Sequence, residues 1–508
     1  MSSECKVTTP VPRLVRGFRD IFAGDVALKR SLIEKVQRVY ESYGFVPLET
    51  PAVEYVDVLG KFLPESATPA GGIFAFRNPD VTGSAAGDDA EAWLSLRYDL
   101  TAPLARIAAQ YPDLPKPYRR YQVGSVWRYE KPGPGRFREF MQMDFDAVGV
   151  PTVAADAEAC CVMCDAFEAI GFARGEYLVK VSNRKVMQGV LESCGLSGAI
   201  GSIGADERAL AVLRAIDKLD RLGERGVVEL LGKGRKDDSG DFMAGANLSA
   251  SQIEVVLGYL RSGTTDRGEV CQRLDKLVGG SPSGAAAISE LRQIDAFLCA
   301  VGYGADRVLF DPTIIRGLAY YTGPVFEGVV TKEIVDEDGK ARQFGAVYGG
   351  GRYDDLVERF TGAKVPATGA SIGVDRLLEA VKLCQPPRRS ATADVLIVVV
   401  ERDQVSRYLS IANRCRAAGI KAETYMGEGG MRHQIKYADR LGIPFALISG
   451  GNEVQRGVVQ IKDLAAGAAS AAKVDSREAW RSGQASQTEV PEDGFIDELR
   501  RLLQTRAE

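Results

Sequence analysis

The segment from Tyr121 to Gly149, YQVGSVWRYEKPGPGRFREFMQMDFDAVG, restricts the possible fold more than any other part of the chain. It predicts two extended strands joined by a loop, because the PGPG run removes backbone donors and permits backbone angles that other residues avoid. Side chains alternate between the faces of a strand, so Arg128 and Glu130 share one face of the first strand. The polar face of the second strand carries Arg138, Phe140, Gln142, Asp144 and Asp146, and its apolar face carries Met141, Met143, Phe145 and Ala147.

We therefore expect a hairpin whose apolar face packs into a core. Arginines and acids beside an aromatic ring suit a ligand that carries phosphates, an aromatic base and an amine. Taken alone, the pattern fits a salt-bridged surface hairpin equally well.

The composition is that of a globular protein with several domains. A length of 508 residues predicts two to four domains. No apolar run approaches the about 20 residues that span a bilayer, and the N-terminus lacks a signal-peptide pattern. Nine cysteines in so long a chain favour a reducing cytoplasm over a disulfide framework. The net charge of -4 neither predicts nor excludes an RNA partner.

The chain has a single histidine, His433, in a segment that reads as an exposed helix. Zinc sites built on histidine and Ser-His or Cys-His nucleophiles need an imidazole near the chemistry, so these classes are disfavoured. Cys160, Cys161 and Cys164 lie in an apolar helical pattern with no matching second pair, which favours buried thiols over a metal cluster.

Three further segments carry chemistry. IIRGLAYYTGPVFE (314–327) places an arginine and two adjacent tyrosines between strands. YGGGRYD (348–354) allows close approach of backbone to a ligand. GASIGVDR (369–376) is a small-residue strand entering a helix, with Arg376 near the helix start, where anions are favoured. Each segment alone fits an ordinary core strand or turn.

Together these segments resemble the class II aminoacyl-tRNA synthetases, and in form the histidyl-tRNA synthetases most. WRYE, GRFREF and QMDFDAVG resemble motif 2, and GASIGVDR resembles motif 3. RGLAYYTG and YGGGRYD match two histidine-specific signatures. RYDLT (97–101) matches the family's amino-acid motif, and the helix at 25–44 with the strand broken by Pro51 resembles motif 1. Two positions depart from common family patterns. Many members carry an acidic residue at the position of Ala319, and many carry a glutamate at the position of Asp146.

The resemblance implies an α+β fold: a class II antiparallel-sheet catalytic domain with a helical insertion, followed by a small α/β anticodon-binding domain. The catalytic domain is predicted over 1–185 and 306–384, and the insertion over 186–305. The anticodon-binding domain, with a C-terminal helix, is predicted over 392–508.

The implied reaction is ATP-dependent ligation of L-histidine to tRNA(His) through histidyl-adenylate. By motif position, Arg128 and Arg316 are the catalytic residues. The residues implied to bind histidine are Asp99, Thr101, Arg128, Gln142, Asp146, Tyr320 and Tyr321. Those implied to bind ATP are Arg128, Glu130, Arg136, Phe140 and Arg376.

The resemblance further implies Mg²⁺ alongside ATP, no protein residue assigned as a metal ligand, a homodimer and no membrane association. Most bacterial members also read an extra 5′ guanine on their tRNA through polar residues of the motif 2 loop, which here is Lys131-Pro132-Gly133-Pro134-Gly135.

Three other functions remain open from the sequence. The first is a synthetase-like regulatory subunit of ATP phosphoribosyltransferase, which usually lacks the C-terminal domain and degrades the arginine motifs. The second is another class II synthetase, for glycine, proline or threonine, which should lack RGLAYYTG and YGGGRYD. The third is a nucleotide-binding module without catalysis.

Overall fold

The structure is a computed structural model. The residues that it describes are 11–60, 72–81, 92–133, 135–196, 206–216, 218–236, 241–314, 321–335, 339, 341–342, 344–384, 391–464, 466 and 487–507. Two compact units account for most of the chain, one spanning mainly 29–385 and the other 386–508.

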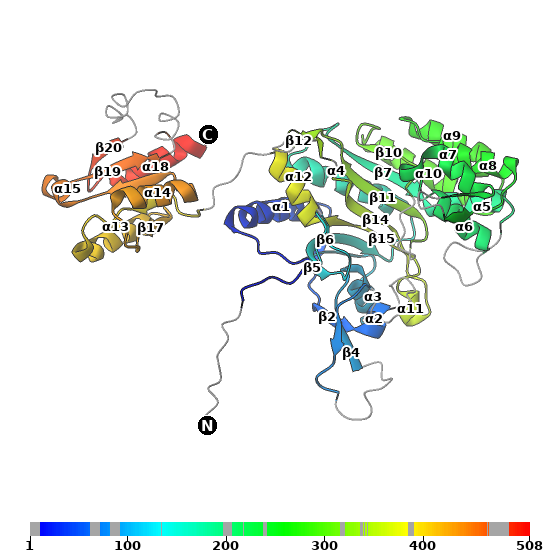
Figure 1. Cartoon of the computed structure of the whole chain (residues 1–508), viewed down its shortest axis with the longest axis horizontal. Helices are drawn as coiled ribbons and strands as arrows, with labels where there is room; N and C mark the ends of the chain where they lie inside the picture. Colours follow the sequence, from blue (N-terminus) through cyan, green and yellow to red (C-terminus); the bar gives the residue numbers. More distant parts are fainter. Residues whose placement is uncertain are drawn as a thin grey trace. The chain divides into compact units, whose positions relative to one another are not determined.

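An eight-stranded sheet forms the centre of the first unit (Figure 1). Neighbouring strands from β5 to β7 run antiparallel, whereas the pairs at the two edges, β1 with β5 and β7 with β10, are parallel. In spatial order the strands are β1 (Val46–Pro47), β5 (Tyr118–Trp127), β6 (Glu139–Val148), β15 (Ala367–Gly373), β14 (Ala346–Arg352), β11 (Pro324–Val330), β7 (Tyr177–Asn183) and β10 (Val308–Phe310). The antiparallel centre confirms the predicted fold class.

The predicted hairpin is β5 and β6, in a register that places Arg120 opposite Asp146 and Gln122 opposite Asp144. Its apolar face packs as expected: the ring of Tyr40 lies 5.0 Å from that of Phe145, between centroids. The polar face is more enclosed than the sequence suggested, because β6 is an inner strand with β15 on its other side. Gln142, Asp144 and Asp146 are therefore buried.

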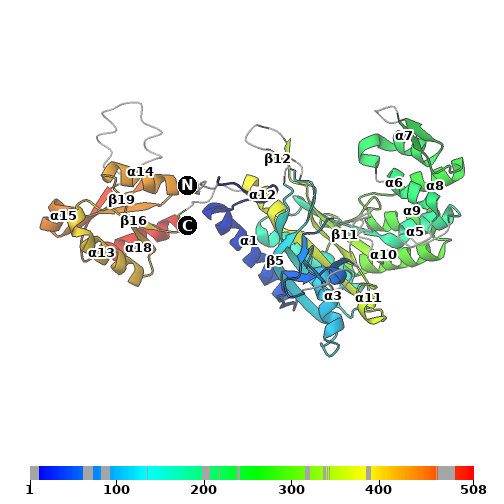
Figure 2. The same cartoon turned by 60° about the horizontal axis from the view of Figure 1, so that its bottom comes forward.

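Helices cover this sheet and close its core. Tyr40 belongs to α1 (Ala23–Ser42), which lies along the β5–β6 side (Figure 2). The helix α4 (Ala154–Ile170) packs against β7, β11, β14 and β15, and α12 (Val374–Cys384) packs against β6. Cys160, Cys161 and Cys164 are buried in α4, and burial raises the pKa of each thiol. They are core thiols, as predicted.

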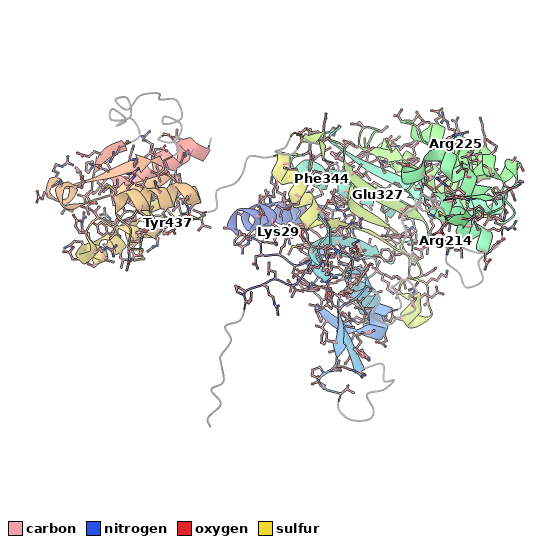
Figure 3. All side chains as sticks on the ribbon, viewed as in Figure 1. Lys29, Arg214, Arg225, Glu327, Phe344 and Tyr437 are labelled. Atoms are coloured by element: carbon pink, nitrogen blue, oxygen red, sulfur yellow. The ribbon has the colours of Figure 1, made fainter. Side chains whose placement is uncertain are left out.

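Among the described residues between β7 and β10, six helices form a cluster beside that edge of the sheet in both views (Figures 1 and 2). They are α5 (Arg184–Ser193), α6 (Glu207–Ile216), α7 (Leu219–Leu231), α8 (Ala250–Leu260), α9 (Arg267–Val278) and α10 (Pro282–Ala300). Helix α10 packs against α4, α5 and α9, which ties the cluster to the sheet. The segment also contains a two-stranded hairpin, β8 (Gly234–Lys236) with β9 (Phe242–Ala244), that helical periodicity did not predict. Arg214 on α6 and Arg225 on α7 are exposed (Figure 3).

Smaller elements complete the unit. A three-stranded sheet has the order β2 (Val53–Tyr55), β4 (Trp93–Leu96), β3 (Ala75–Arg77). The remaining elements are α2 (Val56–Gly60), α3 (Thr101–Gln110), α11 (Glu358–Thr361) and the pair β12 (Ile334–Val335) with β13 (Ala341–Arg342).

The second unit is a small α/β domain with a five-stranded sheet. Its strands, in spatial order, are β17 (Ala422–Thr424), β16 (Val395–Ile397), β18 (Phe445–Ile448), β19 (Val458–Asp463) and β20 (Gln487–Pro491). The first three strands are parallel to one another, β19 runs antiparallel to β18, and β20 runs antiparallel to β19. Its other elements are the 3₁₀ turn η3 (Arg402–Gln404) and the helices α13 (Val405–Ala417), α14 (Met431–Leu441), α15 (Gly451–Arg456) and α18 (Phe495–Ala507).

Alternation along β16 divides the core of this unit in two. Val395 and Ile397 pack with residues of α13 and α18, while Leu396 packs with α14. His433 is exposed on α14, as predicted, and its Nδ1 lies 2.9 Å from the hydroxyl of Tyr425. Within the described part of the chain, no helix is long and apolar enough to cross a membrane.

Candidate functional site

A cavity of about 640 Å³ opens over β6, β14 and β15. Ten residues predicted from the sequence line it: Asp99, Thr101, Arg128, Glu130, Arg136, Phe140, Gln142, Asp146, Tyr321 and Arg376. They come from segments that are far apart in the chain, so the fold brings the predicted residues to one place. Arg316 and Tyr320, together with Ala319, lie outside the described residues.

One end of the cavity is acidic. Asp99, Asp144 and Asp146 are all buried and all line it. Burial raises the pKa of each carboxyl, to about 7 for Asp144. Asp99 accepts backbone hydrogen bonds at Oδ1 from Thr101 and Ala102, at 3.2 and 2.9 Å, which fixes it at the start of α3. This end suits a cationic ligand group.

Two side chains not predicted from the sequence hold Asp146 in place. The guanidinium of Arg120 is fully buried, and its Nη2 lies 2.8 Å from Oδ2 of Asp146. The hydroxyl of Tyr353 donates a hydrogen bond to Oδ1. Gly369 on β15 is opposite Asp146, and a Cβ there would collide with the carboxylate. The small-residue strand therefore makes room for this acid as well as for a ligand.

Arg128 lines the cavity and contacts two aromatic rings. Its guanidinium carbon is 4.3 Å from the ring centroid of Tyr98 and 5.2 Å from that of Phe140. Its Nε donates to the backbone oxygen of Tyr98, at 3.2 Å. Stacking and one hydrogen bond orient the group while its terminal nitrogens remain available for an anion.

The opposite end of the cavity is cationic. Arg376 donates to the backbone oxygen of Ala346, at 2.6 Å. Its pKa is lowered, first by burial and then by the positive charge of Arg136. An anion placed between these two cations, such as a polyphosphate, would offset their repulsion.

Asp375 ties this end to the sheet and to the N-terminal segment. Its Oδ2 accepts from the backbone N–H of Met141, at 2.6 Å, and its Oδ1 forms an ion pair with Arg19. The guanidinium carbon of Arg19 lies 3.8 Å from the ring centroid of Phe137. The contacts of Asp375 and Arg19 thus fix the loop between β5 and β6 against α12.

Two arginines of the motif segments do not face the cavity. Arg138 was placed on the polar face of the hairpin by alternation, but it precedes β6 and stacks on Tyr129, with 4.3 Å from guanidinium carbon to ring centroid. Alternation fails there because the strand has not yet begun. Arg352 of YGGGRYD points into the core, where Nε donates to Oδ2 of Asp156, at 2.9 Å.

Comparison with known proteins agrees with this geometry. The sequence model of the family described as Histidyl-tRNA synthetase matches residues 17–377, and that described as Anticodon binding domain matches residues 394–481. The chain belongs to the histidyl-tRNA synthetase family.

Relatives and solved structures extend the match over nearly the whole chain. The histidine--tRNA ligase of Paracoccus denitrificans is 50% identical over 98% of this chain and 99% of that protein. That of Dinoroseobacter shibae is 49% identical over 99% of both. The crystal structure of histidyl-tRNA synthetase from Nostoc sp. PCC 7120 matches 98% of this chain with a TM-score of 0.71 at 26% identity, covering all 100% of that chain.

The histidyl-tRNA synthetase site holds several residues that sequence reasoning missed: Arg120, Asp144, Tyr348, Tyr353, Ser371 and Asp375. Alternation gave a usable signal for Asp144, which was placed on the polar face but given no role. Tyr348 and Tyr353 lie within YGGGRYD, and Ser371 and Asp375 lie within GASIGVDR, so the matched motifs offered a signal for all four. For Arg120 no signal existed, because a fully buried arginine is uncommon and its partner is known only from strand register.

Proposed function

We propose that this chain joins L-histidine to tRNA(His) by way of histidyl-adenylate. The observation that carries the proposal is one cavity with buried carboxylates at one end and arginines at the other. Histidine supplies an ammonium group for the acids, and ATP supplies phosphates for the arginines. In-line attack of a carboxylate on the α-phosphate depends mainly on positioning and charge stabilisation, so no nucleophilic side chain is required.

For histidine, we assign Asp99 to the ammonium group, assisted by Thr101 and Gln142. Asp146 would accept a hydrogen bond from the imidazole ring, and Tyr321 would bond the same ring. The buried position of Asp146, held by Arg120 and Tyr353, supports this assignment. Tyr320, by its neighbouring place in the signature, is assigned beside the ring.

For ATP, we assign Arg128 to the α-phosphate and to the attacking carboxylate of histidine. Arg136 would reach the outer phosphates, and Phe140 with Arg376 would enclose the adenine ring, with Glu130 near its amine. Arg316 is assigned to the charge that grows on the α-phosphate during attack, by its place in the family signature. The ring contacts of Arg128 support its part in this scheme.

Mg²⁺ fits this site as an ion bound mainly by the phosphates of ATP. In the described part of the chain, no group of three or more His, Cys, Asp or Glu side chains is suited to a resident metal ion. When bound, the ion neutralises phosphate charge.

We further propose a homodimer through the region around the three-stranded sheet. Exposed apolar side chains occur on its strands, on β1 and directly after α3: Val46, Val53, Tyr55, Trp93 and Tyr111. A second copy would cover them. Light scattering on the purified protein tests this, and a monomeric mass at micromolar concentration would reject it. Free, mostly buried cysteines support a cytoplasmic location.

ATP–pyrophosphate exchange tests the main proposal. Exchange should require histidine, and charging should require tRNA(His). Exchange with glycine, proline or threonine instead would indicate another synthetase. Absence of exchange with every amino acid would indicate a binding protein, such as a regulatory subunit.

A further inference from the structure

Asp144 is a buried acid of the cavity that the assigned roles leave unused. It lies on the same face of β6 as Gln142 and Asp146, and β15 places Ser371 directly opposite it. Asp144 is only 2% exposed, and its Oδ1 has no hydrogen-bond partner among the described residues. An unpaired buried carboxylate oxygen costs stability, so its retention requires an explanation.

Ser371 connects Asp144 to Gln142. Nε2 of Gln142 donates to Oγ of Ser371, at 2.8 Å. Ser371 lies directly opposite Asp144 across the strand pair, and its hydroxyl, which has one proton, can donate it to the Asp144 carboxylate, whose pKa the serine lowers. An ionised carboxylate only accepts, so the proton of Ser371 points toward Asp144 and its oxygen accepts from Gln142.

The direction of this chain fixes the orientation of the Gln142 amide. With Nε2 bound to Ser371, the carbonyl oxygen Oε1 is left buried and without a partner among the described residues. Gln142 lines the cavity. A carbonyl oxygen accepts from an ammonium group that reaches it, whereas an NH₂ group in the same place would repel that group.

We propose that Asp144 is a positioning residue that acts through Ser371 to hold the Gln142 amide with its oxygen toward the cavity, in the orientation that binds the ammonium group of histidine. The inference rests on the assignment of Gln142 to that group, and it adds a residue that sets the polarity of the contact.

The relay has a second state in which Asp144 is protonated. Five charged or titratable groups interact electrostatically with Asp144. They are Arg120 on β5, Asp146 on β6, Arg97 and Asp99 before α3, and Tyr40 on α1. Burial raises its pKa to about 7; Arg120 and Ser371 lower it, and Asp146 and Asp99 raise it. A protonated Asp144 donates to Ser371, whose proton then turns to Gln142. The amide flips, and its NH₂ group enters the cavity.

Three variants test the relay by histidine-dependent ATP–pyrophosphate exchange. Asp144→Asn keeps the shape but lets the residue donate to Ser371; KM for histidine should rise about 10-fold, the scale of one lost hydrogen bond to a charged group. Both kcat and KM for ATP should change less than about 3-fold. Ser371→Ala should raise KM for histidine, and Ser371→Thr, which keeps the hydroxyl, should restore it.

The double variant Asp144→Asn/Ser371→Ala separates a relay from two independent contacts. If Asp144 acts through Ser371, the double variant should match Ser371→Ala alone. Additive losses, or equal losses for histidine and ATP, would overturn the proposal. Should Asp144→Asn fail to fold, the Ser371 pair decides the matter, because equal KM values in Ala and Thr variants overturn it as well.

The pH profile adds a readout that a structural role does not move. The ratio of KM values, Asp144→Asn over the unmodified enzyme, should fall as the pH is lowered from 8 to 6. The imidazole of free histidine titrates in this range but affects both enzymes alike. A constant ratio would refute the relay. Lack of histidine-dependent exchange in the unmodified enzyme would instead refute the proposed function itself.

Discussion

The catalytic sheet contains two buried arginine–aspartate clusters that differ in how completely they are paired. In the first, Arg352 donates to Asp156 through Nε and Nη2, at 2.9 and 2.5 Å, and Thr368 donates to the other oxygen, at 2.8 Å. The remaining guanidinium nitrogen, Nη1, donates to the backbone oxygen of Val150. We call these three side chains the paired cluster.

The second cluster, which we call the open cluster, consists of Asp144 and Asp146, which line the cavity, and of the buried Arg120, which pairs with Asp146. Nε and Nη1 of Arg120 and Oδ1 of Asp144 have no hydrogen-bond partner among the described residues. Both clusters are buried, yet only the open cluster borders the cavity. Complete pairing stabilises a fold, while incomplete pairing beside a cavity leaves polar atoms that a ligand can satisfy.

The largest expected effect is on the stability that the paired cluster provides. Asp156→Ala leaves the buried Arg352 without its carboxylate and should lower the free energy of unfolding by about 3 kcal/mol or more. Urea unfolding measures this, with Glu34→Ala as control, because Glu34 and Arg38 form an exposed pair that contributes about 0.5 kcal/mol or less. In folded protein, KM for histidine should stay unchanged; a rise would break the distinction between the clusters.

A cation assigned to the reacting phosphate by the family signature should affect chemistry rather than stability. Arg316→Ala should lose at least about 10²-fold in adenylate formation, the scale for a positioned charge stabiliser, and should unfold like the unmodified enzyme. Arg225→Ala on α7 is the matched control, because that side chain is 95% exposed (Figure 3). Near-normal pyrophosphate exchange in Arg316→Ala would remove Arg316 from catalysis.

Within the open cluster, Asp146→Asn should weaken the use of histidine and spare ATP. The neutral amide keeps the shape but loses a charged acceptor, so kcat/KM for histidine should fall by about 10- to 100-fold. Steady-state exchange with each substrate varied in turn measures the two losses. Equal losses for histidine and ATP would assign Asp146 a structural role like that of Asp156.

Asp144→Asn should stabilise the fold even though it weakens histidine binding. Its pKa is raised to about 7 by burial, so the folded state holds the proton more tightly than the unfolded state. Its stabilising contribution is greatest at low pH and is lost as the pH rises toward 7. Asp144→Asn should therefore raise the free energy of unfolding by at least about 1 kcal/mol at pH 8. The gain should shrink as the pH is lowered toward 4; a pH-independent difference in urea midpoints would contradict this.

The smallest effect is expected at the tRNA end. The loop Lys131–Gly135 has no amide side chain for a base edge, and lysine and backbone mainly position phosphates. Gly133 and Arg136 close the loop by mutual backbone hydrogen bonds, at 3.3 and 2.9 Å. Transcripts with and without the extra 5′ guanine should be charged at rates within about 10-fold, the scale of one base contact. A preference of about 10³-fold or more would show that another segment reads the guanine.

By itself the sequence determined the fold class and ten of the residues that line the cavity. The hairpin, the small-residue strand and the α/β alternation of the second unit are local patterns, because side-chain period and turn residues depend on neighbours in the chain. These patterns and the family motifs placed ten side chains in one cavity. The β8–β9 hairpin within the insertion was missed because both strands are three residues long, too short for alternation to register.

Only the tertiary structure decided which polar residues were paired and which were left open. Asp156 lies in a helical pattern and Asp144 on the polar face of a predicted strand, but neither pattern tells whether the carboxylate finds a partner. Strand register sets Arg120 opposite Asp146 and Ser371 opposite Asp144, while the core brings Arg352 to Asp156 across 196 residues. Hydrogen bonds reach only about 3 Å, so their pairing depends on contacts between segments that the sequence keeps far apart.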